Sequence, residues 1–556
     1  MKLDTSDNRP ETIGIVGSGF SGVCTALHML RNAVENPPAK PIKITMFEKA
    51  GQRFAGGIAY GMAGNEHFTN IPARMLSPYA DKPGDLVDWL KGRAEKNWRT
   101  DSGDRIAEAL QGNYSEHTLV PRRLYQVYLL DRLRTAVKEA RQADVADVNV
   151  IYGDVRRITP TRDGRAQVAV KQEGDLFSKR YSFDHAIKAT GHLQPREAPF
   201  LRKMDQRARA NRCVEDLWEG KEKINDFIRD PRVKTLGVLG TGLSAFDVVL
   251  SAKKQGYFDR PDAKMVLMSR NGLTHARMDR TDIPMPKITF NDLPPTPTTV
   301  GQVPGYVREV FDKYREQGFE DWTIVASMRP LVPQLIKESG IPTQQLADLL
   351  QKNSSLVGTM SIGVGAQVHS QVQELVDRGQ VEIVPASIHG VHQNADGKLE
   401  VKLTRRGQDA AEQIKIDGLV AALGPANDYA KADGKLARNM RRNGVLLPDP
   451  ETGVGIEVDE QRRVVDSKGR TISSISAIGP MTAGDAMTEE GKFGPAGQNI
   501  PGIRDHAKIL AESLVPGPAP AVENVASPLN DWRNKRRTGK PANNQGPDIF
   551  RRLGGL

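Results

Sequence analysis

Two stretches of the chain share one order of apolar and polar positions. The first has a short apolar run at 13–16, a glycine-rich turn at 17–22, a helix-like segment to about Arg31, and a second apolar run at 42–47. The second has apolar runs at 236–240 and 264–268, with a turn and a helical stretch to about Gln255 between them. Short apolar runs bounded by turn residues are typical of buried strands. Each stretch therefore predicts a strand–turn–helix–strand unit of an α/β fold.

The first turn has the glycine spacing of a dinucleotide site. Gly17 permits the tight turn, Gly19 lets the backbone approach a pyrophosphate, and Gly22 allows close packing of helix on strand. Glu48 ends the second strand, where its carboxylate can accept hydrogen bonds from a ribose diol. A glycine turn in an unrelated α/β domain is the alternative. The turn residues predicted to bind the cofactor are Gly17, Ser18, Gly19, Phe20, Ser21 and Gly22.

The second turn repeats the first with a different charge at the end of its second strand. That strand ends at Ser269 and Arg270, so arginine stands where the first unit has an acid. Arginine suits a 2′-phosphate, whereas glutamate repels one. The first site therefore favours FAD and the second NADPH, unless Arg270 is only a surface charge. The residues predicted to hold NADPH are Gly240, Thr241, Gly242, Leu243, Ser244, Ala245, Ser269 and Arg270.

A further repeat suggests how the units are nested. DHAIKATG at 184–191 and DGLVAALG at 417–424 each place an acid, an apolar run and a small-residue turn after an alternating stretch, near 168 and near 399. Alternation predicts antiparallel strands. We expect two Rossmann-like domains in an α/β fold, with an FAD-binding domain at 1–200 and 375–514 and an NADPH-binding domain inserted at 201–374. The helical patterns within 271–375 predict a helical elaboration, and 515–556 a basic, Pro-rich tail.

Composition narrows the class of protein. The chain has 556 residues and a net charge of +10, and part of that surplus lies in the tail, in NKRRTGK and FRR. No nucleic-acid motif accompanies it, and anionic cofactors are a sufficient use for positive charge. The two cysteines, Cys24 and Cys213, form no CxxC, which argues against a redox-active dithiol, and Cys24 is expected to be a small core residue. No apolar run approaches membrane length and no secretion signal is evident, so a cytoplasmic protein without a membrane partner is expected.

Longer motifs extend over most of residues 13–510. They are IGIVGSGFSG, FEKAGQRFAGGIAYG, HFTNIPARM, VPRRLYQVYL, DHAIKATGH, LGVLGTGLSAFDVVLS, LMSRNGL and AIGP. In these motifs the chain resembles the FAD/NAD(P)-binding flavoproteins that include class B flavin monooxygenases and amino-acid N-hydroxylases. Their ATG motif usually has Leu or Phe where Lys188 stands here. The FxGxxxH core of Baeyer–Villiger enzymes is not evident.

The resemblance implies roles for matching residues. Glu48 and Lys49 would join the first turn in holding the FAD adenosine and pyrophosphate, and Arg122 would reach the phosphates or the flavin edge unless it is a salt-bridged structural residue. A helix starting near Pro501 would stabilise negative charge on the reduced flavin. The remaining residues carried over to the FAD site are Asn70, Ile71, Met75, Val155, Thr190, Gly191, Gly479 and Pro480.

The resemblance also implies an activity. NADPH would reduce FAD, oxygen would form a C4a-hydroperoxyflavin, and a small amine or amino acid would be hydroxylated. An NADPH:acceptor dehydrogenase or oxidase is the alternative, and a non-enzymatic redox-sensing flavoprotein a third. The catalytic residue stays unknown, with Asn70, His275 and Arg277 as candidates; Asn70 could instead only satisfy a turn. No metal-ligand spacing joins His192, His275 and His369, so no metal is expected. The oligomeric state is left open.

Overall fold

The computed structural model describes residues 9–94, 114–278, 284–353, 359, 363–426, 428–431, 434–484 and 499–516. All of these lie in one compact unit that extends to residue 517. The basic tail predicted at 515–556 lies outside the described residues except for its first two. Among the helices that the structure describes, none is both long and apolar enough to cross a lipid bilayer.

The first sheet is built around the first glycine turn. Its strand order is β17-β18-β7-β1-β2-β3, parallel except where β17 meets β18. Side chains alternate between its two faces, because successive residues of a strand point to opposite sides. Ile13 and Ile15 face the helices, whereas Val16 packs in the cluster on the other face. The strands are β1 (Glu11–Val16), β2 (Ile42–Glu48), β3 (Ala146–Tyr152), β7 (His185–Lys188), β17 (Arg463–Val465) and β18 (Thr471–Ala477).

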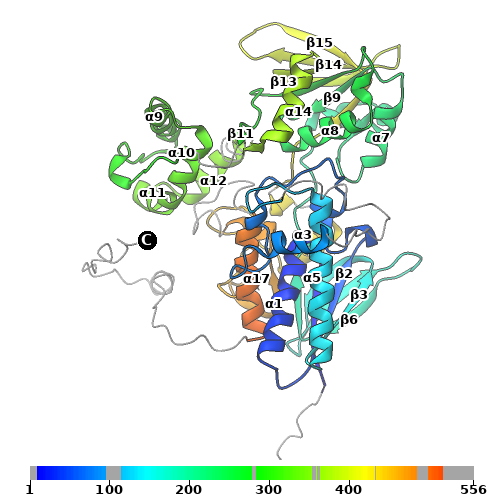
Figure 1. Cartoon of the computed structure of the whole chain (residues 1–556), viewed down its shortest axis with the longest axis vertical. Coiled ribbons are helices and arrows are strands. Elements are labelled where there is room, and N and C mark those ends of the chain that lie inside the picture. The colour runs from blue at the N-terminus through cyan, green and yellow to red at the C-terminus, as the bar shows by residue number, and fades with distance from the viewer. Residues whose placement is uncertain are drawn as a thin grey trace, which may run out of the picture. The chain divides into compact units, whose positions relative to one another are not determined.

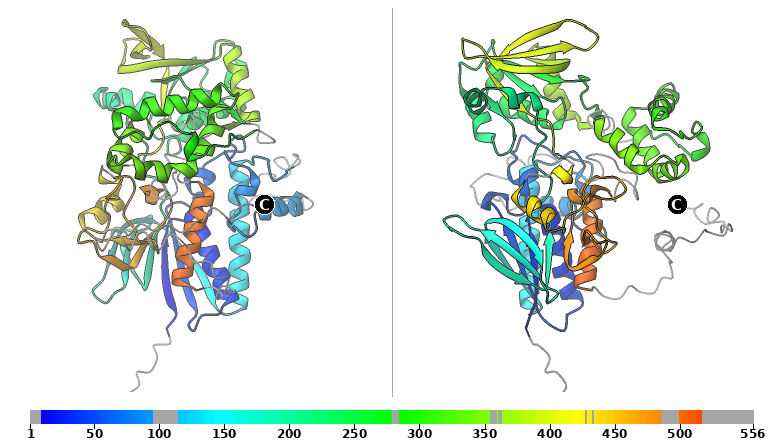
Figure 2. Two further views of the ribbon diagram at one scale, coloured as in Figure 1. Left: turned by 90° about the vertical axis from the view of Figure 1, so that its left-hand side faces the viewer. Right: turned by 180° about the vertical axis from the view of Figure 1, so that it is seen from behind.

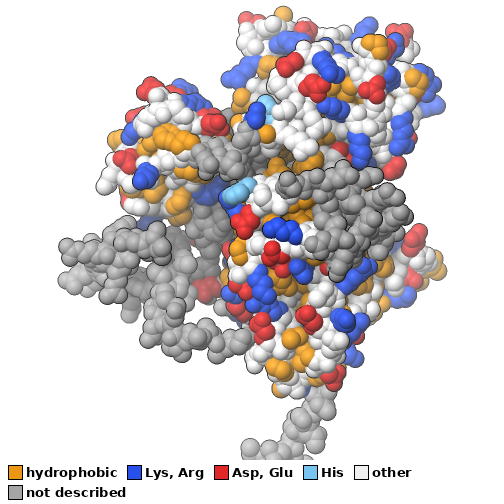
Figure 3. Space-filling view, in the orientation of Figure 1, with side chains coloured by type: hydrophobic (Ala, Val, Ile, Leu, Met, Phe, Trp, Pro, Cys, Tyr) orange, Lys and Arg blue, Asp and Glu red, His pale blue; other side chains and the backbone are white. Residues whose placement is uncertain are grey.

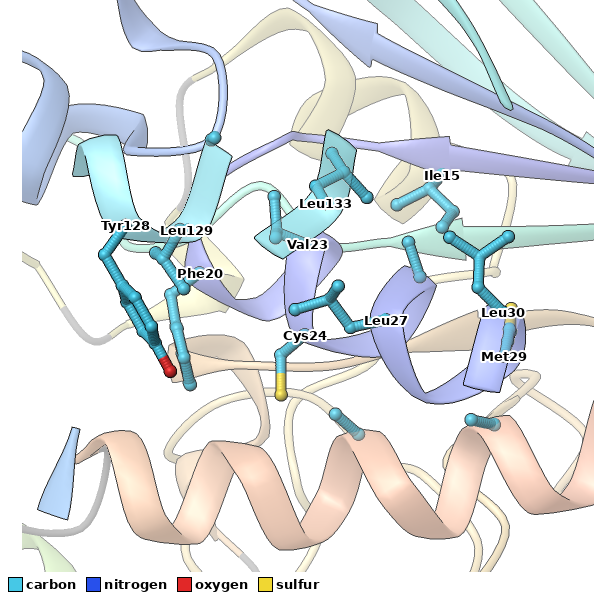
Figure 4. Close-up of a cluster of buried hydrophobic side chains, with 14 of the residues drawn as sticks. Ile15, Phe20, Val23, Cys24, Leu27, Met29, Leu30, Tyr128, Leu129 and Leu133 are labelled. Atoms are coloured by element: carbon cyan, nitrogen blue, oxygen red, sulfur yellow. The ribbon is translucent and has the colours of Figure 1, made fainter. Parts of the chain in front are cut away.

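Three helices cover one face of this sheet, and α1 packs between the other two (Figure 1). They are α1 (Phe20–Glu35), α5 (Arg122–Gln142) and α17 (Ile500–Leu514), the last confirming the helix predicted near Pro501. Cys24 on α1 is fully buried among their apolar side chains, as predicted for a small core residue (Figure 4). Burial raises the pKa of its thiol far above the ordinary value, so it is not a reactive thiolate.

The other face carries an antiparallel sheet of β4 (Asp154–Pro160), β5 (Ala166–Lys171) and β6 (Lys179–Phe183). Phe47 of β2 meets the rings of Tyr181 and Phe183 edge-on across the two layers. The first domain also contains α2 (Gly57–Gly61), α3 (Asp85–Ala94) and α15 (Lys435–Arg442).

The second sheet corrects the predicted domain boundary at residue 375. Its order is β15-β14-β13-β10-β9-β16-β8, so the strands between 381 and 421 belong to the second domain rather than to the first. β13 pairs in parallel with β10, and β16 with β9. The second part of the first domain therefore begins after β16, the last strand of this sheet along the chain. The strands are β8 (Cys213–Val214), β9 (Thr235–Leu239), β10 (Lys264–Ser269), β13 (Val381–Gln393), β14 (Leu399–Arg405), β15 (Ala411–Ile416) and β16 (Gly418–Ala421).

Helices complete the second domain and confirm the predicted elaboration. α6 (Gln206–Arg212), α7 (Lys221–Arg229), α8 (Leu243–Lys254) and α14 (Ala366–Asp377) accompany the sheet, and β11 (Arg277–Met278) pairs with β12 (Val364–Gly365). The elaboration consists of α9 (Val303–Arg315), α10 (Asp321–Met328), α11 (Val332–Ser339) and α12 (Thr343–Lys352), drawn in green in Figures 1 and 2. It has a small core of its own around Phe311 and Ile324. On the face shown in Figure 3, basic and acidic side chains are interspersed.

Candidate cofactor and substrate site

The first turn has no room for side chains at two of its glycines. Gly17 has φ +105°, and a Cβ there would lie 2.4 Å from the Ala189 carbonyl oxygen. A Cβ on Gly22 would lie 2.1 Å from the Gly17 carbonyl oxygen. Gly19 caps α1, and a Cβ on it would lie 3.4 Å from the Cα of Gly57. The turn is thus a bare backbone cradle at a helix N-terminus, which is how proteins hold a dinucleotide pyrophosphate.

Hydrogen bonds within the protein hold Glu48 beside the first turn. Its Oε2 accepts the Ser18 hydroxyl at 2.7 Å, and its Oε1 accepts the Lys49 N–H at 2.8 Å. Each oxygen also accepts a longer backbone hydrogen bond, from the Ser18 N–H at 3.3 Å and from the Ala50 N–H at 3.4 Å, so four contacts fix the carboxylate beside the turn. Lys49 itself points to solvent and pairs with Glu219 at 3.5 Å.

The second turn reproduces the first in its backbone geometry. Gly240 has φ +113°, and a Cβ there would lie 2.6 Å from the Ala422 carbonyl oxygen, as Gly17 meets Ala189. Gly242 caps α8, as Gly19 caps α1. Ala245 takes the place of Gly22, so this turn accommodates one methyl group. The matching motifs at 184–191 and 417–424 therefore place equivalent strands, β7 and β16, against equivalent turns.

The charge at the second turn differs from that at the first. The Thr241 and Ser269 hydroxyls lie 3.0 Å apart, in the arrangement that Ser18 and Glu48 have in the first domain. Ser269, rather than Arg270, therefore takes the position of Glu48, and Arg270 follows it. Arg270 is exposed and donates a long hydrogen bond of 3.4 Å to the Lys352 carbonyl. Burial and the Arg270 charge both lower the pKa of Arg196, so two guanidinium groups approach each other here.

A polar network links the loop before α5 to α8. Arg122 donates to the Phe68 carbonyl at 2.9 Å and to the Asp247 carboxylate at 2.8 Å. Arg122 is thus salt-bridged, as one alternative from the sequence expected, and its contact with FAD stays a prediction. His67 Nδ1 accepts the Gly64 N–H, so Nε2 of the neutral ring donates to the Asp247 carbonyl at 3.1 Å. Desolvation lowers the pKa of His67, which keeps that ring neutral.

A small recess with a cavity volume of about 20 Å³ lies beside this network. Asn70 and Arg122 line it from the first domain, and Leu243 and Asp247 line it from the beginning of α8. The recess therefore joins the predicted flavin loop to the helix that begins at the second turn. Its other lining residues are Phe68, Thr69, Phe246, Leu250, Val364, Gly365 and Val368.

Residues 14–193 match a protein family described as FAD-NAD(P)-binding. The matched residues lie in the first domain, from β1 to the turn after β7. The Mycobacterium tuberculosis protein Rv3403c, itself described as uncharacterised, is 24% identical over 180 residues, which are 29% of this chain and 32% of that protein. The match thus spans about a third of the length of this curated relative.

Solved structures extend the likeness to nearly the whole chain. The Kutzneria sp. 744 ornithine N-hydroxylase has a TM-score of 0.54 at 16% identity and covers 91% of this chain and 99% of its own. The Erwinia amylovora cadaverine monooxygenase, solved with FAD, has a TM-score of 0.57 at 12% identity and covers 97% and 100%. The Pseudomonas aeruginosa ornithine hydroxylase has a TM-score of 0.56 at 13% identity and covers 91% and 99%. At these identities the likeness establishes the fold, which is that of flavoproteins with two dinucleotide-binding domains.

Of the other residues predicted to bind FAD, four lie near the first turn and three lie elsewhere in the first domain. Thr190 is exposed beside the first turn, and Gly191 follows it. A Cβ on Gly479 would lie 2.5 Å from the Ser21 hydroxyl oxygen, so the segment with Gly479 and Pro480 also reaches this turn. Ile71 packs against the core around α1. Val155, on β4, is buried in the apolar cluster between the two sheets of the first domain. Met75 ends a single helical turn at 73–75. Their contacts with FAD stay predictions.

The catalytic candidates are not brought together. His275 is buried, and its Nε2 would lie 3.4 Å from a Cβ on Gly242, so it belongs to the second turn. Arg277 is exposed on β11, while Asn70 lies in the recess. His192 is solvent-accessible, yet desolvation by the surrounding protein lowers its pKa to about 4. Within the described residues no three His, Cys, Asp or Glu side chains are grouped as metal ligands would be.

Sequence reasoning missed three residues at this site. Asp247 is separated by 125 positions from Arg122, and His67 by 180 from the α8 carbonyl that it binds. Arg196 carries no motif of its own; its one signal is its place shortly after the small-residue turn at 189–191. A search for charged residues following each such turn would have found Arg196.

Proposed function

We propose that this chain is an FAD-dependent, NADPH-consuming monooxygenase that hydroxylates the amino group of a small amine or amino acid. The observation that carries the proposal is the pair of equivalent glycine turns, the first beside the acid Glu48 and the second beside Ser269 and Arg270. The ornithine and cadaverine hydroxylases with which the chain shares its fold support the class of substrate.

The first turn fits FAD. A Cβ at Gly17 or Gly22 would fill the space against the backbone, so the cradle stays open to a diphosphate. Glu48 accepts from the adenosine ribose, and Ser18 fixes the orientation of that carboxylate. When bound, FAD would accept the hydride and activate oxygen, and the protein's part is to bind, orient and exclude water.

The second turn fits NADPH. Gly240 and Gly242 leave the N-terminus of α8 open, and Ser269 adds no acid against a 2′-phosphate. Arg270 and Arg196 supply positive charge at that end of the site. Because α8 is tied to the loop of Asn70 through Asp247 and Arg122, nicotinamide and flavin would be held by parts of one hydrogen-bonded network.

The test is product formation rather than NADPH oxidation alone. The full-length protein is purified, its flavin content is measured, and NADPH consumption is followed in air with ornithine, lysine, cadaverine and putrescine. Hydroxylamine formed in near equality with NADPH consumed supports the proposal. NADPH consumption that yields only hydrogen peroxide, or that requires a quinone, makes the chain an oxidase or dehydrogenase instead. Bound flavin that NADPH does not reduce favours a sensor.

Two glycine-to-alanine variants distinguish a specific loss of NADPH binding from a general destabilisation of the fold. Gly240→Ala places a methyl group 2.6 Å from a carbonyl oxygen, and we expect flavin to be retained but its reduction by NADPH to be lost. Gly318→Ala is the matched control, because Gly318 has φ +87° but no atom within 4 Å of a new Cβ. If both variants are reduced as fast as the parent, the second turn does not bind NADPH.

A further inference from the structure

Lys188 is a lysine in an unusual place. It ends β7 and its residue surface is 2% exposed, whereas lysines seldom lie in a protein interior without a partner. The motif that it belongs to carries an apolar side chain at this position in the flavoproteins that the chain resembles. The amine of Lys188 therefore lies at a buried position that an apolar side chain could fill.

Among the described residues, the contacts of Lys188 include no acid. Nζ donates to the Thr190 hydroxyl at 2.8 Å and lies 3.3 Å from the Met481 sulfur. The Tyr429 ring centre is 5.9 Å away. None of the ion pairs formed among the described residues involves Lys188, and burial alone lowers the pKa of its amine to about 7.

The described elements packed around Lys188 contribute no opposing charge. β1 and β18 bring Val16 and Ala477 into register with it. The turns at 480–482 and 429–431 bring Met481 and Tyr429. Of these four residues only Tyr429 can titrate, and burial raises the pKa of its phenol, so it stays neutral.

The amine lies one hydrogen bond behind the first glycine turn. A Cβ on Gly17 would lie 3.0 Å from the Cα of Thr190, so the residue that Lys188 binds packs directly on the cradle. Thr190 is exposed there, and its hydroxyl has one proton to donate. If Lys188 is an ammonium it can only donate to Thr190, which leaves the Thr190 proton for an acceptor outside.

We propose that Lys188 is a proton-binding positioning residue of the first dinucleotide site: its amine takes up a proton when the cofactor diphosphate binds, and the ammonium then orients the Thr190 hydroxyl toward that anion. The inference rests on the proposed function, since it requires FAD at this turn. A low-dielectric site strengthens the attraction between a buried cation and an anion, which is why protonation and binding favour each other.

The sign of the pH dependence follows. The bound anion raises the pKa of Lys188 above its value of about 7 in the free protein. Affinity for FAD is then greatest at low pH and falls as pH rises above that value, by up to about tenfold per pH unit for one linked proton.

The experiment measures binding and protons, not turnover. The FAD dissociation constant of the full-length protein is measured by flavin fluorescence from pH 6 to 9, and calorimetry in buffers of different ionisation enthalpy counts protons taken up. The parent protein should take up a proton and lose affinity above pH 7. Lys188→Met should bind FAD with no proton uptake and a flat profile. Lys43→Met, an exposed lysine on β2 of the same sheet, is the control and should behave like the parent.

Thr190→Val keeps the amine and removes the hydroxyl, so it should lower both the affinity and the proton uptake, even if Lys188→Met does not fold. FAD binding without proton uptake in the parent, or the same uptake in Lys188→Met, overturns the inference and leaves the proposed function standing. Failure of the parent to bind FAD at any pH overturns both.

Discussion

Replacing Arg270 tests which residue distinguishes NADPH from NADH. The side chain is exposed, and its hydrogen bond to the Lys352 carbonyl is long, at 3.4 Å. A surface substitution of this kind changes the free energy of unfolding by about 0.5 kcal/mol or less. A change in cofactor use can therefore be attributed to binding rather than to loss of the fold.

The expected magnitude follows from exposure. A charge-assisted hydrogen bond to a phosphate contributes about 1.5–3 kcal/mol. Because Arg270 is solvent-exposed, screening favours the lower end, and 1.4 kcal/mol is about a factor of ten. Arg270→Ala should thus raise the KM for NADPH about tenfold and leave that for NADH unchanged. Arg270→Glu should raise it further, since the carboxylate repels the 2′-phosphate and the half-buried Arg196 then has an acid to pair with.

The assay compares kcat/KM for the two nucleotides, with flavin reduction followed under anaerobic conditions. Arg378→Ala is the control: it removes an exposed arginine that pairs with Glu374 beyond the second turn. An NADPH to NADH preference that is the same in Arg270→Ala as in the parent would refute the assignment. A fall in kcat/KM for both nucleotides would mean that Arg270 supports the turn rather than the phosphate.

Three further changes test the scaffold. Gly22→Ala places a methyl group 2.1 Å from the Gly17 oxygen. It should lower the flavin content, and it should lower the free energy of unfolding, measured by denaturant titration, by about 1–3 kcal/mol. Asp247→Asn should cost about 1.5–3 kcal/mol by breaking the largely buried pair with Arg122, and should slow flavin reduction in stopped flow. Burial lowers the pKa of His28 to about 4, so the neutral ring stabilises the fold above pH 6.5 and up to about 3 kcal/mol is lost as pH falls toward 4; His28→Gln should flatten that fall in thermal melts.

Each of these has a matched comparison. Ala245→Gly, at the equivalent position of the second turn, should cost about 1 kcal/mol or less, and an equal loss in both variants would contradict the steric argument. Asp230→Asn breaks an exposed pair with Arg232 and should be nearly neutral. If the pH profile of His28→Gln matches that of the parent, other groups determine the acid stability.

The two glycine turns and the buried strands that lead into them were predictable from the sequence. Both depend on local properties: a positive φ that glycine adopts freely at residues 17 and 240, and short apolar runs that are buried on both faces. The same holds for the helical elaboration, since apolar periodicity lies within one segment, whereas the helix at 500–514 was expected only from the family resemblance.

The partners of these segments were decided only by the tertiary structure. The alternation near 399 predicted antiparallel strands, but not that β13 before it would pair with β10, because alternation specifies the faces of a strand and not its neighbour. The role of Arg122 depended on Asp247, 125 positions away, and the setting of Lys188 on Met481, 293 positions away. The sequence by itself thus determined the two cradles, whereas the fold decided which charges stand next to them, since only packing brings distant side chains within hydrogen-bonding distance.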